Sequence, residues 1–204
     1  MIAIIDYGLG NVLAFRNVFH RLNRSAVVAR TPDELAGATR LILPGVGSFD
    51  HAMSQFDASG MRGEVERLVC EERIPVLGVC VGMQMLAASS DEGVLPGLGW
   101  VEGKVRKFDA GRMPAGTHLP HMGWNDVVAA HPGGLFHGLE GEARFYFLHS
   151  YYFECADSAN IEATTDYGIR FTCAVRKDNI VGVQFHPEKS HRFGAQLLTN
   201  FADM

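Results

Sequence analysis

The sequence predicts an α/β fold in which a mostly parallel sheet is flanked by helices and extended by additional antiparallel strands. Two observations predict the parallel part: short, fully apolar runs of strand length, and amphipathic helical patterns between them. A third observation predicts the antiparallel part. The second half of the chain is rich in β-branched and aromatic residues, divided by Gly, Asp and Asn turns.

The first half of the chain supplies the parallel strands. Its short apolar runs are residues 2–5, 41–43 and 76–79. Asn11 is suited to cap a helix after the first run, because apolar residues then follow at helical spacing. Pro44 and Gly45 are expected to end the second strand. A further helix is expected to begin directly after Cys80.

The second half supplies the antiparallel strands and a final helix. The segments with strand composition are residues 100–108, 144–153 and 169–175. Residues 177–179 are a predicted hairpin turn that joins 171–175 to 180–185. The last helix is expected from about residue 191 to 201, since its apolar side chains lie on one face.

Size and composition restrict the class of protein. The 204 residues, of which 47% are hydrophobic and 20% charged, predict a single domain spanning residues 1–204. The net charge of −5, with no block of Lys or Arg, argues against nucleic acid or an anionic membrane as the main partner. We expect a cytoplasmic protein, because the chain starts as a core strand and no apolar stretch could cross a bilayer. No pair of cysteines has CxxC spacing, so neither a zinc knuckle nor a dithiol redox site is suggested. We expect neither a metal nor a cofactor.

Residues 78–82, Gly-Val-Cys-Val-Gly, have the G-x-C-x-G form of a nucleophile elbow between a strand and a helix. The turn is so tight that glycine is needed two residues before and after Cys80. At the start of a helix, backbone N–H groups and the helix dipole favour a thiolate, and the N–H of Val81 can bind an oxyanion. The alternative is a buried cysteine between glycines that only allow close packing.

A base for this thiol is offered by His186, which follows an apolar strand directly. Glu188 lies two residues on and can reach the imidazole after the turn at Pro187. A carboxylate there would hold the ring in one tautomer and stabilise its protonated form. The alternative is a strand-end histidine with a local hydrogen bond. His118 and His121 have no further ligand nearby, so a metal pair is not expected.

Five sequence blocks together resemble the class I (triad-type) glutamine amidotransferases, and more narrowly the glutaminase subunits of imidazole glycerol phosphate synthase. The blocks are IIDYGLGN at 4–11, PGVGSF at 44–49, GVCVGMQ at 78–84, LPHMGWN at 119–125 and GVQFHPEKS at 182–190. The third and fifth are shared by the whole superfamily, whereas the other three are characteristic of this subunit. The resemblance covers nearly the whole chain and implies the flavodoxin-like fold of that class.

The resemblance implies a role for each matching residue. Cys80 attacks the side-chain amide of glutamine, His186 protonates the departing ammonia and then activates water, and Glu188 holds His186. The oxyanion would be bound by the backbone N–H groups of Val46 and Val81, and the loop that carries Val46 would change conformation when the partner is loaded. The implied substrate-binding residues are Gly45, Gly47, Gln84, Glu92, His149, Ser150 and Tyr151.

The chain shows no second catalytic domain that could use the ammonia, so the acceptor site must lie on another polypeptide. The resemblance implies a heterodimer with a HisF-like (β/α)8-barrel cyclase subunit, which makes imidazole glycerol phosphate and AICAR in histidine biosynthesis. The implied interface residues are Pro120, His121, Met122, Gly123 and Trp124.

Three alternatives stay open on the sequence alone. A paralogous subunit could supply ammonia, with a cyclase-like barrel, for amidination of a bacterial surface sugar; residues 95–100 and 190–194 lean that way. A cysteine peptidase or other thiol hydrolase would need neither Glu188 nor Gln84. A catalytically dead binding subunit would have lost its cysteine, whereas Cys80 is present.

Overall fold

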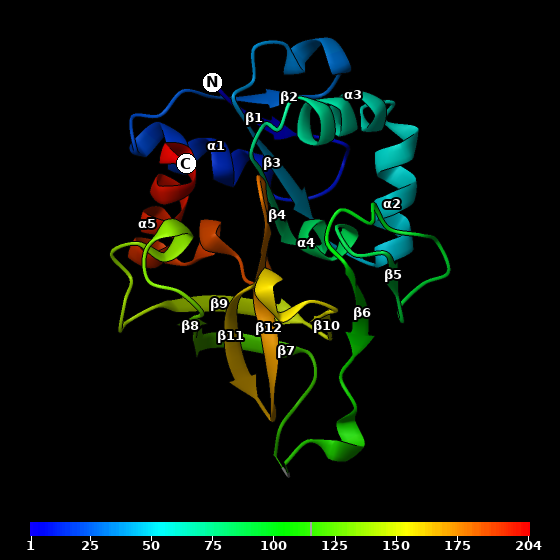
Figure 1. The fold of residues 1–204 in the computed structure, drawn as a ribbon, viewed down its shortest axis with the longest axis vertical. Coiled ribbons are helices and arrows are strands. Elements are labelled where there is room, and N and C mark those ends of the chain that lie inside the picture. The colour runs from blue at the N-terminus through cyan, green and yellow to red at the C-terminus, as the bar shows by residue number, and fades with distance from the viewer. Residues whose placement is uncertain (115) are drawn as a thin grey trace.

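The computed structural model describes residues 1–114 and 116–204, and it is built around one large sheet (Figure 1). Five neighbouring strands of this sheet are parallel. In spatial order they are β2 (Ala26–Ala29), β1 (Ile2–Ile5), β3 (Arg40–Gly45), β4 (Val76–Cys80) and β13 (Ile180–Val183). Their side chains are almost all buried, as expected for parallel strands covered on both faces.

The sheet continues beyond β13 with strands from the second half of the chain. The strands added in order are β12 (Ile169–Lys177), β10 (Tyr151–Cys155), β6 (Gly103–Lys107) and β5 (Ser89–Ser90). The first three join antiparallel, and β5 pairs parallel to β6. β11 (Ile161–Tyr167) pairs with β12 and with β8 (Val128–Ala129). The predicted α/β class with additional antiparallel strands is therefore confirmed.

A separate two-stranded sheet consists of β7 (His121–Asp126) and β9 (Arg144–His149), which run antiparallel. Their register places His121 directly opposite His149. The predicted strand segment 144–153 is divided between β9 and the start of β10, which belong to different sheets, and β7 was not predicted. Its pattern differs from that of an ordinary half-buried strand, because it buries His121 and exposes Met122 and Trp124.

Helices cover both faces of the parallel strands (Figure 1). The α-helices are α1 (Val12–Arg21), α2 (Phe49–Ala58), α3 (Arg62–Glu66), α4 (Val81–Met85) and α5 (His191–Asp203). Helices α1 and α5 contact each other on one side, and α2 contacts α4 on the other. One-turn 3-10 helices occur at Pro32–Leu35, Ala110–Arg112, Gly134–Phe136, Ser158–Asn160 and Pro187–Lys189, and a π-turn occurs at Arg67–Glu71.

Three local predictions are confirmed. Asn11 caps α1, since its side-chain oxygen accepts a hydrogen bond of 3.3 Å from the N–H of Ala14. The hairpin turn lies between β12 and β13, where Asp178 adopts a positive φ of 55° and Lys177 pairs with Ile180. The final helix begins at His191, as expected, and extends two residues past the predicted end.

One boundary was predicted wrongly, because Pro44 and Gly45 do not end β3. The strand continues through both residues, and Gly45 lies opposite Cys80 on β4. A proline is tolerated here because β1 pairs with β3 only as far as Ile42, which leaves the end of β3 with one neighbouring strand. The carbonyl of Pro44 also accepts a hydrogen bond of 2.7 Å from the hydroxyl of Tyr7.

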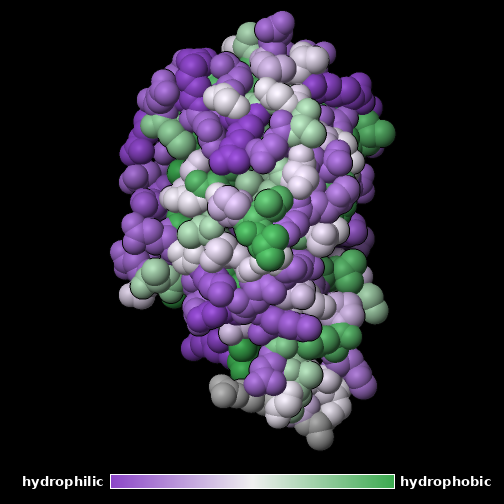
Figure 2. All heavy atoms as spheres, turned by 90° about the vertical axis from the view of Figure 1, so that its right-hand side faces the viewer, coloured by the Kyte–Doolittle hydropathy of each residue, from purple (hydrophilic) through white to green (hydrophobic). Residues whose placement is uncertain are grey.

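The surface on the α2 side is mostly hydrophilic, with hydrophobic residues in small separate groups (Figure 2). Among the described residues, no helix is both long and apolar enough to span a membrane.

Candidate active site

The carboxyl ends of three neighbouring parallel strands create the site. Gly45 at the end of β3 is paired with Cys80 at the end of β4, and Val79 is paired with Val183 at the end of β13. The chain leaving β13 therefore reaches His186 beside Cys80. Crevices outside the carboxyl ends of parallel strands are the usual binding sites of open α/β sheets.

Cys80 occupies the strained turn that a nucleophile elbow requires. Its φ of 56° and ψ of −112° are rare for a residue with a side chain and cost about 1–3 kcal/mol. The flanking glycines are a steric necessity. A Cβ on Gly78 would lie 2.7 Å from the carbonyl oxygen of Gly82, and a Cβ on Gly82 would lie 2.0 Å from that of Leu43. The predicted need for glycine at both positions is confirmed.

His186 and Glu188 form a buried pair. The Nδ1 atom of His186 lies 2.9 Å from Oε1 of Glu188. A carboxylate only accepts, so Nδ1 carries the proton. The backbone of His186 is held as well: its N–H donates to the carbonyl of Tyr146, and its carbonyl accepts a hydrogen bond of 2.6 Å from the hydroxyl of Ser190. The imidazole is thus fixed in both orientation and tautomer.

The electrostatics of the pair favour a protonated imidazole. Burial lowers the pKa of His186, but hydrogen bonds to Cys80 and Glu188 outweigh it and raise the pKa from 6.5 to about 9. The imidazolium is therefore the stable form at neutral pH. An imidazolium beside a thiol stabilises the thiolate, which is the nucleophilic form of cysteine.

A chain of buried amides lies behind the nucleophile. The Nε2 atom of Gln184 lies 3.8 Å from Sγ of Cys80, and its Oε1 accepts a hydrogen bond of 3.0 Å from Nε2 of Gln84. Nε2 of Gln84 also donates to the carbonyl of Tyr151 over 3.3 Å. Gln84 was predicted to contact substrate, but Gln184 was not singled out. In the sequence, Gln184 stands out only as a single amide side chain among the apolar residues 180–185.

A cavity of about 310 Å³ opens above Cys80 and His186. Most of the predicted substrate-binding and oxyanion residues line it: Val46, Gly47, Val81, Gln84, Glu92, His149, Ser150 and Tyr151. Gly45 lies instead at the end of β3, where a Cβ would come within 2.5 Å of the N–H nitrogen of Gly82. Leu148 and Lys189 also line the cavity and were not foreseen, because the folded chain brings them there from β9 and the turn after His186.

Glu92 connects the cavity to the start of α2. Its Oε2 accepts a hydrogen bond of 2.9 Å from the N–H of Phe49. Asp50 makes the reciprocal connection, because its carboxylate accepts from the N–H groups of Val94 and Leu95 at 2.9 and 3.0 Å. Phe49 and Asp50, which follow the loop that carries Val46, are therefore hydrogen-bonded to the segment that carries Glu92.

The predicted interface block lies beside this cavity, on β7 and just before it. Pro120 lines the cavity, and Met122 and Trp124 are exposed at 64% and 40%. The ring of Trp124 stacks on His191 at a centroid distance of 5.5 Å. His121 does not share this surface, because its side chain points inward and is only 2% exposed.

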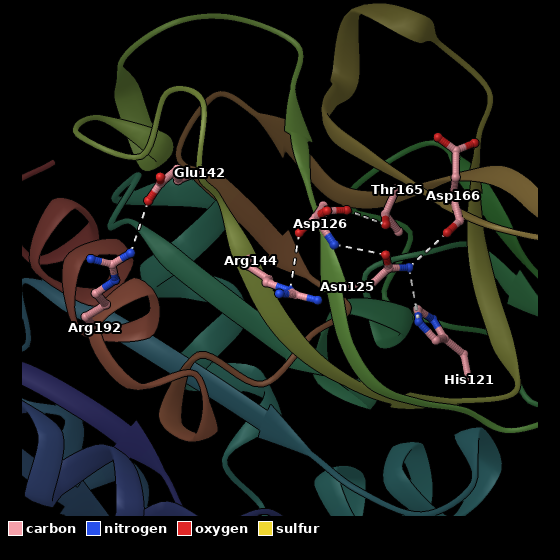
Figure 3. A network of polar contacts seen from close by, with 8 residues as sticks. All are labelled: His121, Asn125, Asp126, Glu142, Arg144, Thr165, Asp166 and Arg192. Atoms are coloured by element: carbon pink, nitrogen blue, oxygen red, sulfur yellow. Dashed lines mark hydrogen bonds and ion pairs between the residues drawn. The ribbon is translucent and has the colours of Figure 1, made fainter.

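A larger cavity, of about 770 Å³, lies away from Cys80. Figure 3 shows two exposed ion pairs at its wall, Arg144 with Asp126 and Arg192 with Glu142. Neither cysteine nor a buried acid–base pair is found among the residues that line it. Chemistry therefore places the candidate active site in the smaller cavity. Within the described ranges, no group of three or more His, Cys, Asp or Glu side chains is arranged to hold a metal ion.

The fold is a parallel α/β sheet, and the site places a cysteine beside a buried histidine–carboxylate pair, an arrangement suited to a thiol nucleophile. A family model described as "Glutamine amidotransferase class-I" matches residues 3–204. Two proteins named imidazole glycerol phosphate synthase subunit HisH, from Bdellovibrio bacteriovorus and Leptospira interrogans, are 60% and 51% identical over the full length of both chains. The chain therefore belongs to the class I glutamine amidotransferases, enzymes that release the amide nitrogen of glutamine, and within them to the family of HisH subunits.

Further similarities agree with this placement. A Pseudomonas aeruginosa protein named imidazole glycerol phosphate synthase subunit HisH 2 is 42% identical over the full length of both chains. A crystal structure titled glutamine amidotransferase superposes with a TM-score of 0.75 at 21% identity, covering 99% of this chain and 97% of that one. The structure of PurLQS from Thermotoga maritima gives a TM-score of 0.73 at 16% identity, with the same coverage. At these identities the two structures support the fold alone.

Proposed function

We propose that this chain is the glutaminase subunit of a heterodimer and passes ammonia to a HisF-like (β/α)8-barrel cyclase subunit. The partner would use the ammonia to make imidazole glycerol phosphate and AICAR in histidine biosynthesis, in the cytoplasm. The observation that carries the proposal is the Cys80–His186–Glu188 arrangement at the base of a cavity large enough for one amino acid. Full-length identity to proteins named as HisH subunits supports the choice of pathway.

In the proposed reaction, the thiolate of Cys80 attacks the side-chain amide carbon of glutamine. A C–S bond forms, and the imidazolium of His186 gives its proton to the departing nitrogen as the C–N bond breaks. The product of this half-reaction is ammonia and a γ-glutamyl thioester. Neutral His186 then takes a proton from water, which attacks the thioester and releases glutamate. Glu188 accepts the hydrogen bond from Nδ1 of His186 throughout and stabilises each imidazolium that forms.

The residues around the triad would bind the substrate and the oxyanion. The N–H of Val81, at the start of α4, and the N–H of Val46 are the proposed oxyanion donors. Glu92 has one carboxylate oxygen free of Phe49, which suits the α-ammonium group of glutamine. The wall of residues 149–151 would receive the α-carboxylate, and Gly47 and Gln84 would lie around the side chain of glutamine.

The proposed partner surface surrounds the mouth of this cavity. Met122, Trp124, Leu148 and Val46 are exposed apolar side chains, and two of them also line the cavity. Exposed apolar residues beside a site are typical of interfaces, and a partly buried tryptophan is a common anchor. A barrel seated there would cover the cavity, so that ammonia could leave toward the second active site without meeting bulk water.

Substitution of the nucleophile tests the division of labour. In the complex with its barrel subunit, Cys80→Ala should abolish product formation from glutamine and leave formation from added ammonium salt intact. Cys70→Ala is the matched control, because Cys70 is exposed and does not line the cavity at Cys80. Loss of the ammonia-dependent reaction in Cys80→Ala would contradict the proposal. Release of glutamate from free glutamine would distinguish the proposed glutaminase from a peptidase.

The loop that carries Val46 is proposed to act as an activity switch, so that the isolated chain hydrolyses glutamine slowly. Full turnover without the partner would contradict this part of the proposal. The second candidate function is ammonia supply for amidination of a surface sugar. Complementation of a histidine auxotroph that lacks its own glutaminase subunit distinguishes the two, since only a subunit of the histidine pathway restores growth.

A further inference from the structure

Two histidines outside the triad face each other across the small sheet. His121 on β7 and His149 on β9 are direct cross-strand neighbours, and Nδ1 of His121 lies 3.0 Å from Nε2 of His149. Both side chains are buried, at 2% and 6% exposure. Two buried imidazoles in contact can form a hydrogen bond only if one nitrogen of the pair carries a proton and the other does not.

The hydrogen bonds at one end of the pair fix the tautomer of His149. Its Nδ1 lies 2.8 Å from the carbonyl oxygen of Tyr151, and a carbonyl oxygen only accepts. Nδ1 of His149 therefore carries the proton. In the neutral ring, Nε2 is then an acceptor, and the proton between the two rings belongs to Nδ1 of His121.

The hydrogen bonds at the other end of the pair show independently that the proton of His121 is on Nδ1 (Figure 3). The amide of Asn125 is oriented by two backbone groups: its Oδ1 accepts from the N–H of Asp126, and its Nδ2 donates to the carbonyl of Asp166, both over 2.9 Å. The same Nδ2 lies 3.3 Å from Nε2 of His121. An NH₂ group donates, so Nε2 of His121 is an acceptor and its proton is on Nδ1.

The four groups thus form a run of hydrogen bonds with one direction, from Asn125 through His121 and His149 to the carbonyl of Tyr151. An additional proton on either ring would place two N–H groups face to face, or one against the NH₂ of Asn125. Burial lowers the pKa of His121 from 6.5 to about 4. Burial, with His121 and His186 as further causes, lowers the pKa of His149 from 6.5 to about 3.

Among the contacts of the described residues, no carboxylate lies against His121 or His149 that would favour a charged ring. The ring of His121 stacks between Phe147 and Tyr167, at centroid distances of 4.6 and 3.8 Å. Phe108 and Phe171 pack against His149. The titratable groups that face the pair are the phenol of Tyr167 on β11 and His186, which follows β13. The carboxylate of Asp166 points away, and that of Asp126 pairs with Arg144 (Figure 3).

The run of hydrogen bonds ends on an atom that the active site also uses. The carbonyl of Tyr151 accepts from His149 and from Gln84, whose amide donates to Gln184 beside Cys80. We propose that His121 and His149 are positioning residues for the glutaminase reaction. Held neutral in their Nδ1–H tautomers, they fix the Tyr151 carbonyl, and through it the Gln84 amide and the wall of residues 149–151. The inference rests on the proposed role of that wall in binding glutamine.

Imidazole ¹⁵N NMR of the whole chain tests the tautomers without reference to activity. We expect two histidines whose Nδ1 is protonated and whose Nε2 is not, with signals unchanged between pH 8 and pH 5. One of the two should disappear in His121→Asn. Signals from either ring that show Nε2–H, or that titrate near the ordinary pKa of 6.5, would overturn the proposal.

Kinetics test the positioning role. His121→Phe retains a flat ring between Phe147 and Tyr167 but removes the donor to His149, whereas His121→Asn retains a donor near the position of Nδ1. An unsatisfied buried acceptor should raise KM for glutamine roughly tenfold in His121→Phe, with kcat changed by less than about threefold. His121→Asn should restore KM to near the wild-type value, and His20→Asn, at an exposed site on α1, is the control.

The two proposals fail in different ways. If wild-type protein released no glutamate from glutamine, the proposed function would be wrong, whatever the imidazole spectrum showed. If wild-type turnover were normal and His121→Phe had the wild-type KM, the positioning role would be wrong while the proposed function stood. Equal loss of activity in the Phe and Asn variants would likewise contradict positioning through the donor.

Discussion

Acidification should destabilise this protein through His121 and His149. Both are held neutral in the folded chain, with pKa values of about 4 and about 3, against 6.5 in an unperturbed histidine. At pH values between the folded pKa of each ring and 6.5, the unfolded chain binds more protons than the folded chain. The stability that the two neutral rings allow is therefore fully present above pH 6.5, and it is lost as the pH falls toward 4.

The size of the effect follows from the shift in each pKa. Each pH unit below 6.5 lowers the free energy of unfolding by about 1.4 kcal/mol for each histidine that stays neutral on folding. From pH 7 to pH 5, each ring should therefore remove about 2 kcal/mol from the free energy of unfolding, and the pair about 4 kcal/mol. Domains of this size are stable by only about 5–15 kcal/mol, so the loss is a large fraction of the total.

Urea unfolding at pH 7 and pH 5, for wild type and His121→Asn, measures this contribution. The variant lacks one of the two titrating rings, so it should lose about 2 kcal/mol less than wild type over this interval. His186, whose raised pKa of about 9 gives stability that is present below 6.5 and lost as the pH rises through 9, is common to both proteins and cancels. A difference below about 0.5 kcal/mol would refute the reasoning, because one protonated ring would then be tolerated inside the fold.

Three further predictions concern the elbow, the base and the β12–β13 turn. Glutaminase activity should fall as the pH rises through about 9, where His186 loses the proton it gives to ammonia, and Glu188→Gln should move this fall to lower pH in a pH–rate profile. Gly82→Ala should lower the free energy of unfolding by roughly 3 kcal/mol or more in chemical denaturation, because its Cβ meets a backbone carbonyl of β3. Gly63→Ala is the control and should not lower it, because the space around Gly63 is open. Asn179→Ala should lower the free energy of unfolding by about 1–3 kcal/mol, since its amide bonds two carbonyls before β4; an unchanged midpoint would exclude that role.

The parallel half of the fold could be predicted from the sequence because its strands are buried on both faces. Such strands appear as unbroken apolar runs, and the runs at residues 2–5 and 76–79 match β1 and β4 closely. The strand β7 could not be predicted in this way. It buries a histidine and exposes Met122 and Trp124, the reverse of the usual alternation, and Gly123 within it adopts a φ of 130°.

The arrangement of Cys80, His186 and Glu188 could be predicted because each residue stands in a local pattern: Cys80 lies between two glycines, and His186 lies two residues before Glu188. Other members of the site have no local signature. Gln184 matters because β13 lies next to β4, and Leu148 because the end of β9 crosses above the nucleophile, where its carbonyl oxygen lies 4.0 Å from Sγ of Cys80. Contacts of this kind depend on which strands are neighbours, which a single sequence does not state.

The unexpected length of β3 limits how the loop above Cys80 can move. Gly45 is held in the sheet opposite Cys80, and the N–H of Phe49, which starts α2, is held by Glu92. Only residues 46–48 lie between these two fixed points. A motion confined to three residues is a rotation of one or two peptide planes, and it belongs to the timescale of local loop motion, faster than the closure of a lid or domain. A switch of this kind would leave the outline of the molecule unchanged, so spectroscopy of these backbone amides would detect it where scattering or hydrodynamic methods would not.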